Sequence, residues 1–315
     1  AEKITTAAGT HRISFDDDAQ FFLDGLSTIS TPSSLTLRWA NGEELAILAG
    51  SASQRLDGLR LQFAEFLKIP AADGFPLPAR LYKPRRFDAS TRYPVIVHVY
   101  GGPGAPQVHN SWDRFVLYNN MLLDAGFLVI DIDNRCATGL SKTLEDTIHR
   151  QLMVKGEIDD IVAAVRWLKT QEWVDPDRVG VWGWSGGGTL TLQLMTHSEE
   201  FRAGIAGAAV TDFRYYDSKI SEIYLGLPED NPEGYAASAP ANFAAELSGR
   251  LLLIHGGIDD NVQPQNAWRF AHELQKAGIT FDMMIYPMAK HHVADPLEDK
   301  HLHKTMLEFW QRWLQ

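Results

Sequence analysis

The sequence predicts an α/β fold, in which a mainly parallel sheet is flanked by helices and preceded by a small antiparallel β segment. From residue 66 onward, apolar strand-like runs alternate with helical patterns, which is typical of a parallel sheet covered on both faces. Before residue 60, the chain instead holds short apolar runs separated by acidic or polar turns. We therefore expect two domains, residues 1–58 and residues 59–315.

The N-terminal segment has the pattern of a small antiparallel sheet. Strands are expected at 13–15, 20–23, 35–38 and 45–49, where short apolar runs lie between turn residues. The dipeptide Asn41–Gly42 lies between the last two runs and is a strong signal for a tight hairpin. The unit has no second copy in the sequence, and a single sheet of this kind leaves its edges open.

The larger domain is predicted from hydrophobic periodicity and from helix start and stop signals. Strands are expected at 95–99, 127–131, 178–182, 204–207, 251–255 and 281–286. Helices are expected at 115–125, 156–171, 189–195, 264–277 and 296–314. The last helix carries one apolar stripe, which we expect to pack against the sheet of its own chain: Leu302, Met306, Phe309, Trp310 and Trp313.

The most informative motif is Gly-Trp-Ser-Gly-Gly at residues 183–187. It follows an apolar strand and opens a helical run. A strand that turns sharply into a helix through G-x-S-x-G exposes the serine on a strained elbow, and the glycines remove Cβ atoms that would clash. An ordinary glycine-rich turn is the alternative. The strand before the motif, the helix after it and its downstream partners favour Ser185 as a nucleophile.

Those partners are an acid and a base, each placed after a predicted strand. Asp259 follows the strand that ends at His255, with Asp260 as the alternate acid. His291 follows the next strand, with His292 as its neighbour. The chain order Ser, Asp, His is that of α/β-hydrolases. In such a triad a neutral imidazole takes the serine proton, and the carboxylate orients the imidazole and stabilises its charged form.

An attacked carbonyl also needs hydrogen-bond donors aimed at its developing negative charge. One expected donor is the backbone N–H of Gly186, the residue after the nucleophile. The other should come from the glycine-rich loop that follows strand 95–99, where the phenol of Tyr100 is the candidate. Taken alone, Tyr100 would be interpreted as an ordinary aromatic residue at the end of a strand. The presence of the serine motif favours the catalytic role instead.

Composition and charge narrow the remaining classes. The net charge of −11 argues against nucleic-acid partners, and the longest apolar runs are far shorter than the ~20 residues of a membrane span. The single cysteine, Cys136, excludes an intramolecular disulfide framework and leaves the compartment open. The histidines at 291, 292, 301 and 303 do not have a convincing metal-ligand pattern, because the first pair is claimed by the triad. We expect neither a metal nor a cofactor.

The motifs together resemble the prolyl oligopeptidase family of serine peptidases, and most closely its dipeptidyl peptidase IV branch. The matching stretches run in register from residue 66 to the C-terminus: 99–103, 183–185, 215–218, 224–228, 255–262, 286–287 and His291. The resemblance implies the triad Ser185, Asp259 and His291, and an oxyanion hole made by Tyr100 and Gly186. It also implies that Asn261 binds a substrate carbonyl. The pocket for the side chain before the scissile bond would be lined by Trp184, Val210, Phe213, Tyr216 and Val262.

The resemblance extends to partners. In this family a β-propeller precedes the hydrolase domain, and residues 1–58 resemble its closing part, so we expect that the chain comes from a longer polypeptide. A complete protein with an N-terminal β-extension is the alternative. The family uses its C-terminal helices for dimer contact, which implies a homodimer. It also favours a periplasmic or secreted location over a cytoplasmic one.

The chain departs from dipeptidyl peptidase IV at two pocket positions. Glycine stands at 186, directly after the nucleophile, where that branch has tyrosine, and Ile220 replaces a second pocket tyrosine. Both changes remove aromatic walls that would close around a proline ring. We therefore expect a wider, more aliphatic pocket that tolerates apolar side chains larger than proline.

The predicted function is a serine peptidase that hydrolyses short peptides through an acyl-enzyme, in the manner of dipeptidyl and oligopeptidyl aminopeptidases. A carboxylesterase or acyl-peptide hydrolase on the same fold is one alternative. An inactive relative that serves as an interaction module is another, and the intact serine, aspartate and histidine argue against it.

Overall fold

The computed structural model describes residues 3–51, residue 56 and residues 58–315. The chain divides into two compact units. The first comprises the residues up to Glu65 together with His109–Met121, and the second comprises Phe66–Val108 and Leu122–Gln315. Nothing in the sequence indicated that residues 109–121 belong to the first unit.

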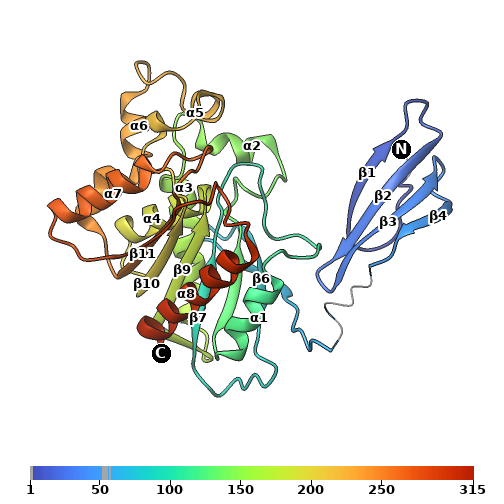
Figure 1. The fold of residues 1–315 in the computed structure, drawn as a ribbon, viewed down its shortest axis with the longest axis horizontal. Helices are drawn as coiled ribbons and strands as arrows, with labels where there is room; N and C mark the ends of the chain where they lie inside the picture. Colours follow the sequence, from blue (N-terminus) through green and yellow to red (C-terminus); the bar gives the residue numbers. More distant parts are fainter. Residues whose placement is uncertain (1–2, 52–55, 57) are drawn as a thin grey trace. The chain divides into compact units, whose positions relative to one another are not determined.

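The first unit contains a four-stranded antiparallel sheet in the order β1-β2-β3-β4 (Figure 1). Its strands are β1 (Thr10–Phe15), β2 (Phe21–Thr28), β3 (Thr31–Trp39) and β4 (Glu44–Ala49), so the prediction of four short strands is confirmed. Gly42 has φ +92°, and its N–H donates to the carbonyl of Trp39 at 2.8 Å, which makes the expected hairpin turn. Inside the sheet, buried Asp24 accepts hydrogen bonds from His11 and Arg38.

The second unit is built on an eight-stranded sheet in the order β12-β11-β10-β9-β7-β8-β6-β5. The run from β12 to β8 is parallel, and β6 is antiparallel to β8. This confirms a mainly parallel sheet. The strands are β5 (Glu65–Pro70), β6 (Pro76–Tyr82), β7 (Tyr93–His98), β8 (Leu128–Ile132), β9 (Val174–Trp184), β10 (Ala203–Gly207), β11 (Arg250–Gly256) and β12 (Asp282–Tyr286).

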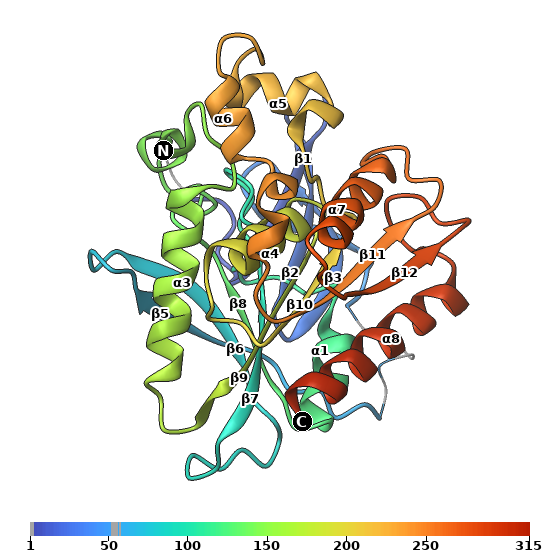
Figure 2. The ribbon, with the colours of Figure 1, turned by 90° about the vertical axis from the view of Figure 1, so that its left-hand side faces the viewer.

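The helices differ from expectation in number more than in position. The expected helices correspond to α1 (Val116–Asp124), α3 (Lys155–Lys169), α4 (Gly186–His197), α7 (Gln265–Lys276) and α8 (Pro296–Leu314). Three short helices were not anticipated: α2 (Lys142–Glu145), α5 (Ser218–Leu225) and α6 (Pro232–Ala237). Figures 1 and 2 both show α5 and α6 at one end of the parallel strands, where they follow β10 in the chain.

Two glycines in adjacent strands show that helices cover opposite faces of this sheet. A Cβ on Gly180 would press against Trp310 and Leu314 of α8, whereas a Cβ on Gly204 would collide with Met195 of α4. Gly204 pairs with Val181, the neighbour of Gly180, and successive residues of a strand point to opposite faces. Helix α8 therefore lies on one face and α4 on the other. The apolar stripe of α8 packs on its own sheet as predicted, with Trp310 fully buried.

Among the helices that the structure describes, none is both long enough and apolar enough to cross a bilayer.

Candidate active site

The parallel strands bring the predicted site residues to a single edge of the sheet. Tyr100 follows β7, Ser185 follows β9, Asp259 follows β11 and His291 follows β12. Because β7, β9, β10, β11 and β12 run parallel, the loops after them leave the same edge. Residues that are up to 191 positions apart, from Tyr100 to His291, are thus collected at one end of the parallel strands of the second unit.

Ser185 lies at the sharp junction between β9 and α4. Its backbone has φ 59° and ψ −121°, a conformation that L-residues rarely adopt, and its N–H donates to the carbonyl of Gly207 at 2.8 Å. The turn is too tight for side chains on either side. A Cβ on Gly183 would collide with Gly187 and with the carbonyl oxygen of Val99, and a Cβ on Gly187 would collide with the same oxygen. The glycines of the motif are therefore needed to hold the serine in this strained position.

Asp259 and His291 form a hydrogen-bonded pair. The Nδ1 of His291 lies 2.8 Å from one carboxylate oxygen of Asp259, and the other oxygen accepts the backbone N–H groups of Asn261 and Val262 at 2.9 and 3.0 Å. Burial on its own raises the pKa of Asp259, but the hydrogen bond from His291 and that from Asn261 bring it below its ordinary value. The group is therefore an anion that faces the imidazole.

A second histidine, His255, contacts the loop that carries Asp259. His255 is buried at the end of β11, and its Nε2 donates to the carbonyl of Val262 at 2.8 Å. The same nitrogen lies 3.5 Å from a carboxylate oxygen of Asp259. Burial lowers the pKa of His255, so the ring is neutral at neutral pH and acts as a hydrogen-bond donor to this loop. Sequence reasoning placed His255 in a strand and missed its contact with the acid.

The loop that carries His291 is also tied to the serine elbow. The indole Nε1 of Trp184 donates to the backbone carbonyl of His291 at 2.7 Å. Trp184 directly precedes Ser185 in the chain. The base and the nucleophile are thus joined through one partly buried hydrogen bond between their supporting segments.

The alternate acid and base identified from the sequence lie in different surroundings. Asp260 is 62% exposed at its side chain and makes an ion pair with Lys290 at 2.6 Å, so it does not face His291. The ring of His292 lies beside that of His291, with a distance of 5.1 Å between ring centres. Of the two candidate acids, Asp259 is the one that the fold brings to the imidazole.

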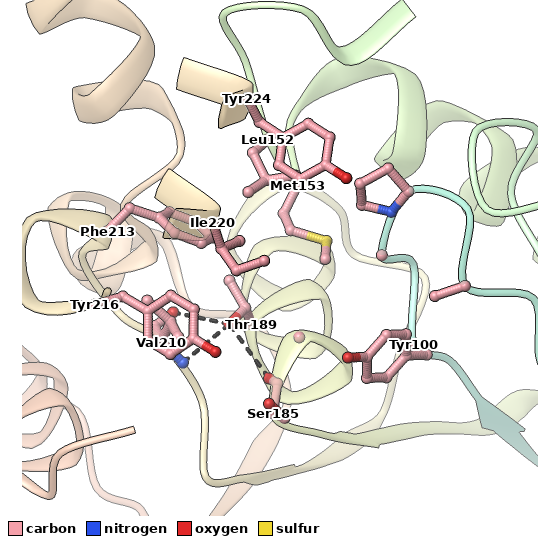
Figure 3. A pocket seen from close by; sticks show the side chains of 14 residues that line it. Tyr100, Leu152, Met153, Ser185, Thr189, Val210, Phe213, Tyr216, Ile220 and Tyr224 are labelled. Carbon is pink, nitrogen blue, oxygen red and sulfur yellow. Dashed lines mark hydrogen bonds between the residues drawn. The ribbon is translucent and has the colours of Figure 1, made fainter. Parts of the chain in front are cut away.

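Ser185 opens into a cavity of about 260 Å³, which Figure 3 shows from close by. The lining includes Tyr100, whose hydroxyl points into the cavity, and Gly186, the two predicted oxyanion donors. Three residues of the predicted side-chain pocket, Val210, Phe213 and Tyr216, also line it, and so does Ile220. The remaining lining residues are Gly102, Pro103, Ala105, Leu152, Met153, Thr189 and Tyr224.

Three predicted substrate residues lie outside the cavity lining. Trp184 and Val262 are buried: the indole N–H of Trp184 donates to the His291 carbonyl, and the backbone N–H of Val262 donates to Asp259. Asn261 stands beside the cavity, and its side-chain oxygen accepts the hydroxyl of Tyr216 at 3.0 Å. Trp184 and Val262 therefore make hydrogen bonds that support the triad, and neither is among the residues that line this cavity.

Leu152, Met153 and Thr189 line the cavity without having been anticipated. Thr189 bridges the pocket floor, because its hydroxyl donates to the carbonyl of Val210 at 2.9 Å and accepts the Val210 N–H at 3.0 Å. Leu152 and Met153 come from the segment before α3, which has neither a motif nor a strand pattern. No signal in the sequence pointed to either residue.

Within the described ranges, no cluster of three or more His, Cys, Asp or Glu side chains is arranged to hold a metal ion.

Comparison with known proteins identifies consistent relatives. Residues 114–315 match the model of the prolyl oligopeptidase family. Dipeptidyl peptidase 8 of Mus musculus is 35% identical over 255 residues, which cover 78% of this chain and 28% of that protein. The crystal structure of Porphyromonas gingivalis dipeptidyl peptidase 4 is similar with a TM-score of 0.95 and 32% identity, over 99% of this chain and 45% of that chain.

A second solved structure agrees. A putative dipeptidyl aminopeptidase IV from Bacteroides ovatus has a TM-score of 0.88 and 36% identity, over 97% of this chain and 43% of that chain. The chain thus spans less than half the length of the solved relatives, and about 28% of the length of the mouse protein.

Proposed function

Because this chain belongs to the prolyl oligopeptidase family, we propose that it is a serine peptidase with an α/β-hydrolase fold that cleaves short peptides through an acyl-enzyme on Ser185. The observation that carries the proposal is the 2.8 Å hydrogen bond from His291 to Asp259, in a loop that Trp184 ties to the serine elbow. In a catalytic triad, a buried carboxylate orients the imidazole that activates a serine hydroxyl for attack.

The hydrogen bond to Asp259 sets the tautomer of the base. Since Nδ1 of His291 donates to the carboxylate, the proton of the neutral imidazole is on Nδ1 and Nε2 is free to accept one. In the proposed reaction, Ser185 Oγ attacks the peptide carbonyl carbon while its proton moves to Nε2. The carbonyl oxygen becomes an oxyanion, which the Tyr100 hydroxyl and the Gly186 N–H stabilise.

The tetrahedral intermediate then collapses. The C–N bond breaks, the imidazolium gives its proton to the departing amine, and the acyl group remains on Ser185 as an ester. Water adds to this ester with His291 again as the base, and the carboxylic acid product leaves. Asp259 stays ionised throughout, in line with the lowering of its pKa.

Substrate recognition in the proposed function rests on the cavity beside Ser185. Val210, Phe213, Tyr216 and Ile220 form an apolar wall for the side chain before the scissile bond. Since the Asn261 side-chain oxygen takes the Tyr216 hydroxyl, its amide N–H donors are assigned to a substrate carbonyl. The relatives are named dipeptidyl peptidases, so release of dipeptides from a free N-terminus is the proposed mode.

Two partners belong to the proposal. We infer that residues 1–58 are the closing strands of a β-propeller that belongs to the same polypeptide, with the catalytic domain at 59–315. We also infer a homodimer, on the resemblance of the C-terminal helices to those of the family.

The test is a comparison of leaving groups and N-termini, with Ser185→Ala as control. Ala-Pro-, Ala-Leu- and Ala-Phe-p-nitroanilide are compared with their N-acetylated forms and with p-nitrophenyl butyrate. Release of p-nitroaniline from the free-amine dipeptides supports the proposal. Hydrolysis of the ester alone would indicate a carboxylesterase, and preference for the acetylated compounds would indicate an acyl-peptide hydrolase.

A further inference from the structure

A side chain on the residue after the nucleophile would press on the residues around it. A Cβ on Gly186 would lie 3.3 Å from the Cε of Met153 and 3.6 Å from the Cζ of Tyr100. Gly186 does not have the positive φ that would demand glycine for conformational reasons. The constraint on a side chain at this position is therefore its neighbours, and the nearest atom that it would meet is the thioether methyl of Met153.

The side chain of Met153 lines the cavity beside Ser185. Its side chain is 97% buried, and Figure 3 shows the thioether pointing into the space that Ser185 and Tyr100 also line. Leu152 and Ile220 are its apolar companions in the lining. A methionine in this position makes an apolar wall that can change shape, because its unbranched chain has several rotatable bonds.

The backbone under Met153 is held in place against its conformational preference. Met153 has φ +56°, a left-handed conformation that non-glycine residues rarely adopt. The buried carboxylate of Glu157 accepts the N–H of Met153 at 2.7 Å and that of Val154 at 3.3 Å. On the other side, the N–H of Leu152 donates to the hydroxyl of Ser238 at 3.1 Å. A strained residue fixed on both sides and aimed at a substrate cavity suggests a functional placement.

We propose that Met153 is the specificity-determining wall of this cavity, standing where a side chain at position 186 would otherwise begin. Met153 lies in the segment before α3, outside the nucleophile motif at residues 183–187. The residue that forms this wall can therefore differ between proteins that share the motif. The inference rests on the proposed function, since it assigns the chemical class of substrate to the same site.

The size of the cavity indicates which side chains this wall admits. A dry cavity of ~150 Å³ is large enough to bind benzene. The cavity of about 260 Å³ beside Ser185 therefore has room for a leucine or phenylalanine side chain in addition to part of the peptide. The preferred substrates are peptides with a large apolar residue before the scissile bond.

A coupled pair of substitutions tests the wall. Gly186→Tyr alone should collide with Met153 and reduce kcat/KM for every substrate by at least about tenfold. Adding Met153→Gly removes the obstacle and suits the left-handed backbone, so the double variant should recover activity. Its ratio of kcat/KM for Ala-Pro-p-nitroanilide to that for Ala-Phe-p-nitroanilide should rise at least about tenfold over the original chain, which is within the range of pocket contacts.

Ile220→Ala is the matched control. It enlarges the same cavity, but Ile220 is not among the atoms nearest to a Cβ on Gly186. Ile220→Ala combined with Gly186→Tyr should therefore not recover activity. Equal recovery with either partner, or an unchanged substrate ratio in the Met153→Gly variants, would overturn the proposal. Thermal melting of each variant separates loss of fold from loss of fit.

A further measurement tests the Met153 wall separately from the proposed peptidase function. If the original chain cleaves no peptide, the same variants are compared by their rates of labelling with a small ethyl and a bulky phenylalkyl fluorophosphonate. A change in that ratio that follows the Met153–Gly186 pair supports the wall although the peptidase assignment fails. A ratio that is the same in all variants, or no labelling of any variant, overturns the wall as well.

Discussion

The indole N–H of Trp184 reaches the backbone carbonyl of His291 at 2.7 Å, across 107 residues of sequence. Trp184 ends β9 and His291 lies in the loop after β12. Two strands, β10 and β11, separate β9 from β12 in the sheet. The bond therefore fixes the base loop directly to the segment that carries the nucleophile, without relying on the strands between them.

Trp184→Phe should weaken catalysis more than it weakens the fold. The loss of this partly buried hydrogen bond leaves the His291 carbonyl without its indole donor, which we expect to cost about 1–3 kcal/mol of stability. The base loop then becomes less well ordered, so kcat should fall while KM changes little. The measurement combines steady-state kinetics with urea unfolding.

The control for Trp184→Phe is Trp313→Phe on α8. Trp313 packs under Arg250, far from the triad in the fold, and its loss should leave kcat unchanged. Equal kinetic effects of the two substitutions would contradict a positioning role for Trp184.

Asp259→Asn should reduce kcat by a factor on the order of 10⁴, because an amide cannot hold the imidazole in the productive tautomer or stabilise its charged form. The backbone donors of Asn261 and Val262 can still bond the amide oxygen, so the loop should keep its shape. Asp260→Asn is a matched control, since that carboxylate pairs with Lys290 at the surface. A similar loss in both variants would remove Asp259 from its assigned role.

Tyr100→Phe should cost about 3 kcal/mol of transition-state stabilisation, as for other single oxyanion donors. The ring remains to fill the space beside Gly186, so KM should change little. Tyr224→Phe tests a second phenol of the same cavity and should have a small effect. The comparison of kcat/KM across the two variants decides the point, and an unaltered rate for Tyr100→Phe would leave the backbone N–H of Gly186 as the main donor.

Glu157 should make the stability of the fold depend on pH. Burial, opposed by hydrogen bonds from its own backbone, Met153 and Val154, raises its pKa to about 7, from an ordinary value of 4.5. The folded state therefore holds a proton that the unfolded state releases between these values, and the free energy of unfolding falls as pH rises from 5 to 7. The full difference is on the order of 3 kcal/mol.

The measurement for Glu157 is urea unfolding at several pH values, compared with Glu157→Gln. Asp133 is also buried, and burial raises its pKa to about 6, so both proteins share its contribution. The difference between them isolates Glu157 and should change with pH. A constant difference from pH 5 to pH 8 would contradict the assignment.

The sequence predicted that the candidate catalytic residues lie together because each of them follows a strongly apolar strand, and parallel strands place such residues at one edge. The strands β5 and β6 escaped notice, since their residues follow no clear alternation. The wall formed by Met153 could not be read from the sequence either. It depends on a left-handed turn held by Glu157, which lies four residues further along and has no local signature.

The second gap concerns support for the triad. Trp184 and Val262 were expected in the substrate pocket, but neither lines the cavity beside Ser185, and each makes a hydrogen bond that supports the triad. The resemblance to the family had placed both residues at the pocket. It could not say which way a buried side chain faces, because that is decided by packing between strands that are distant in sequence.

The central claim is that Ser185 is made reactive by His291, and labelling with a fluorophosphonate followed by peptide mass spectrometry tests it most directly. Folded protein should carry one adduct on the peptide that contains Ser185, and Ser185→Ala should carry none. Labelling at a different residue, or no adduct on a sample that melts cooperatively, would contradict the account.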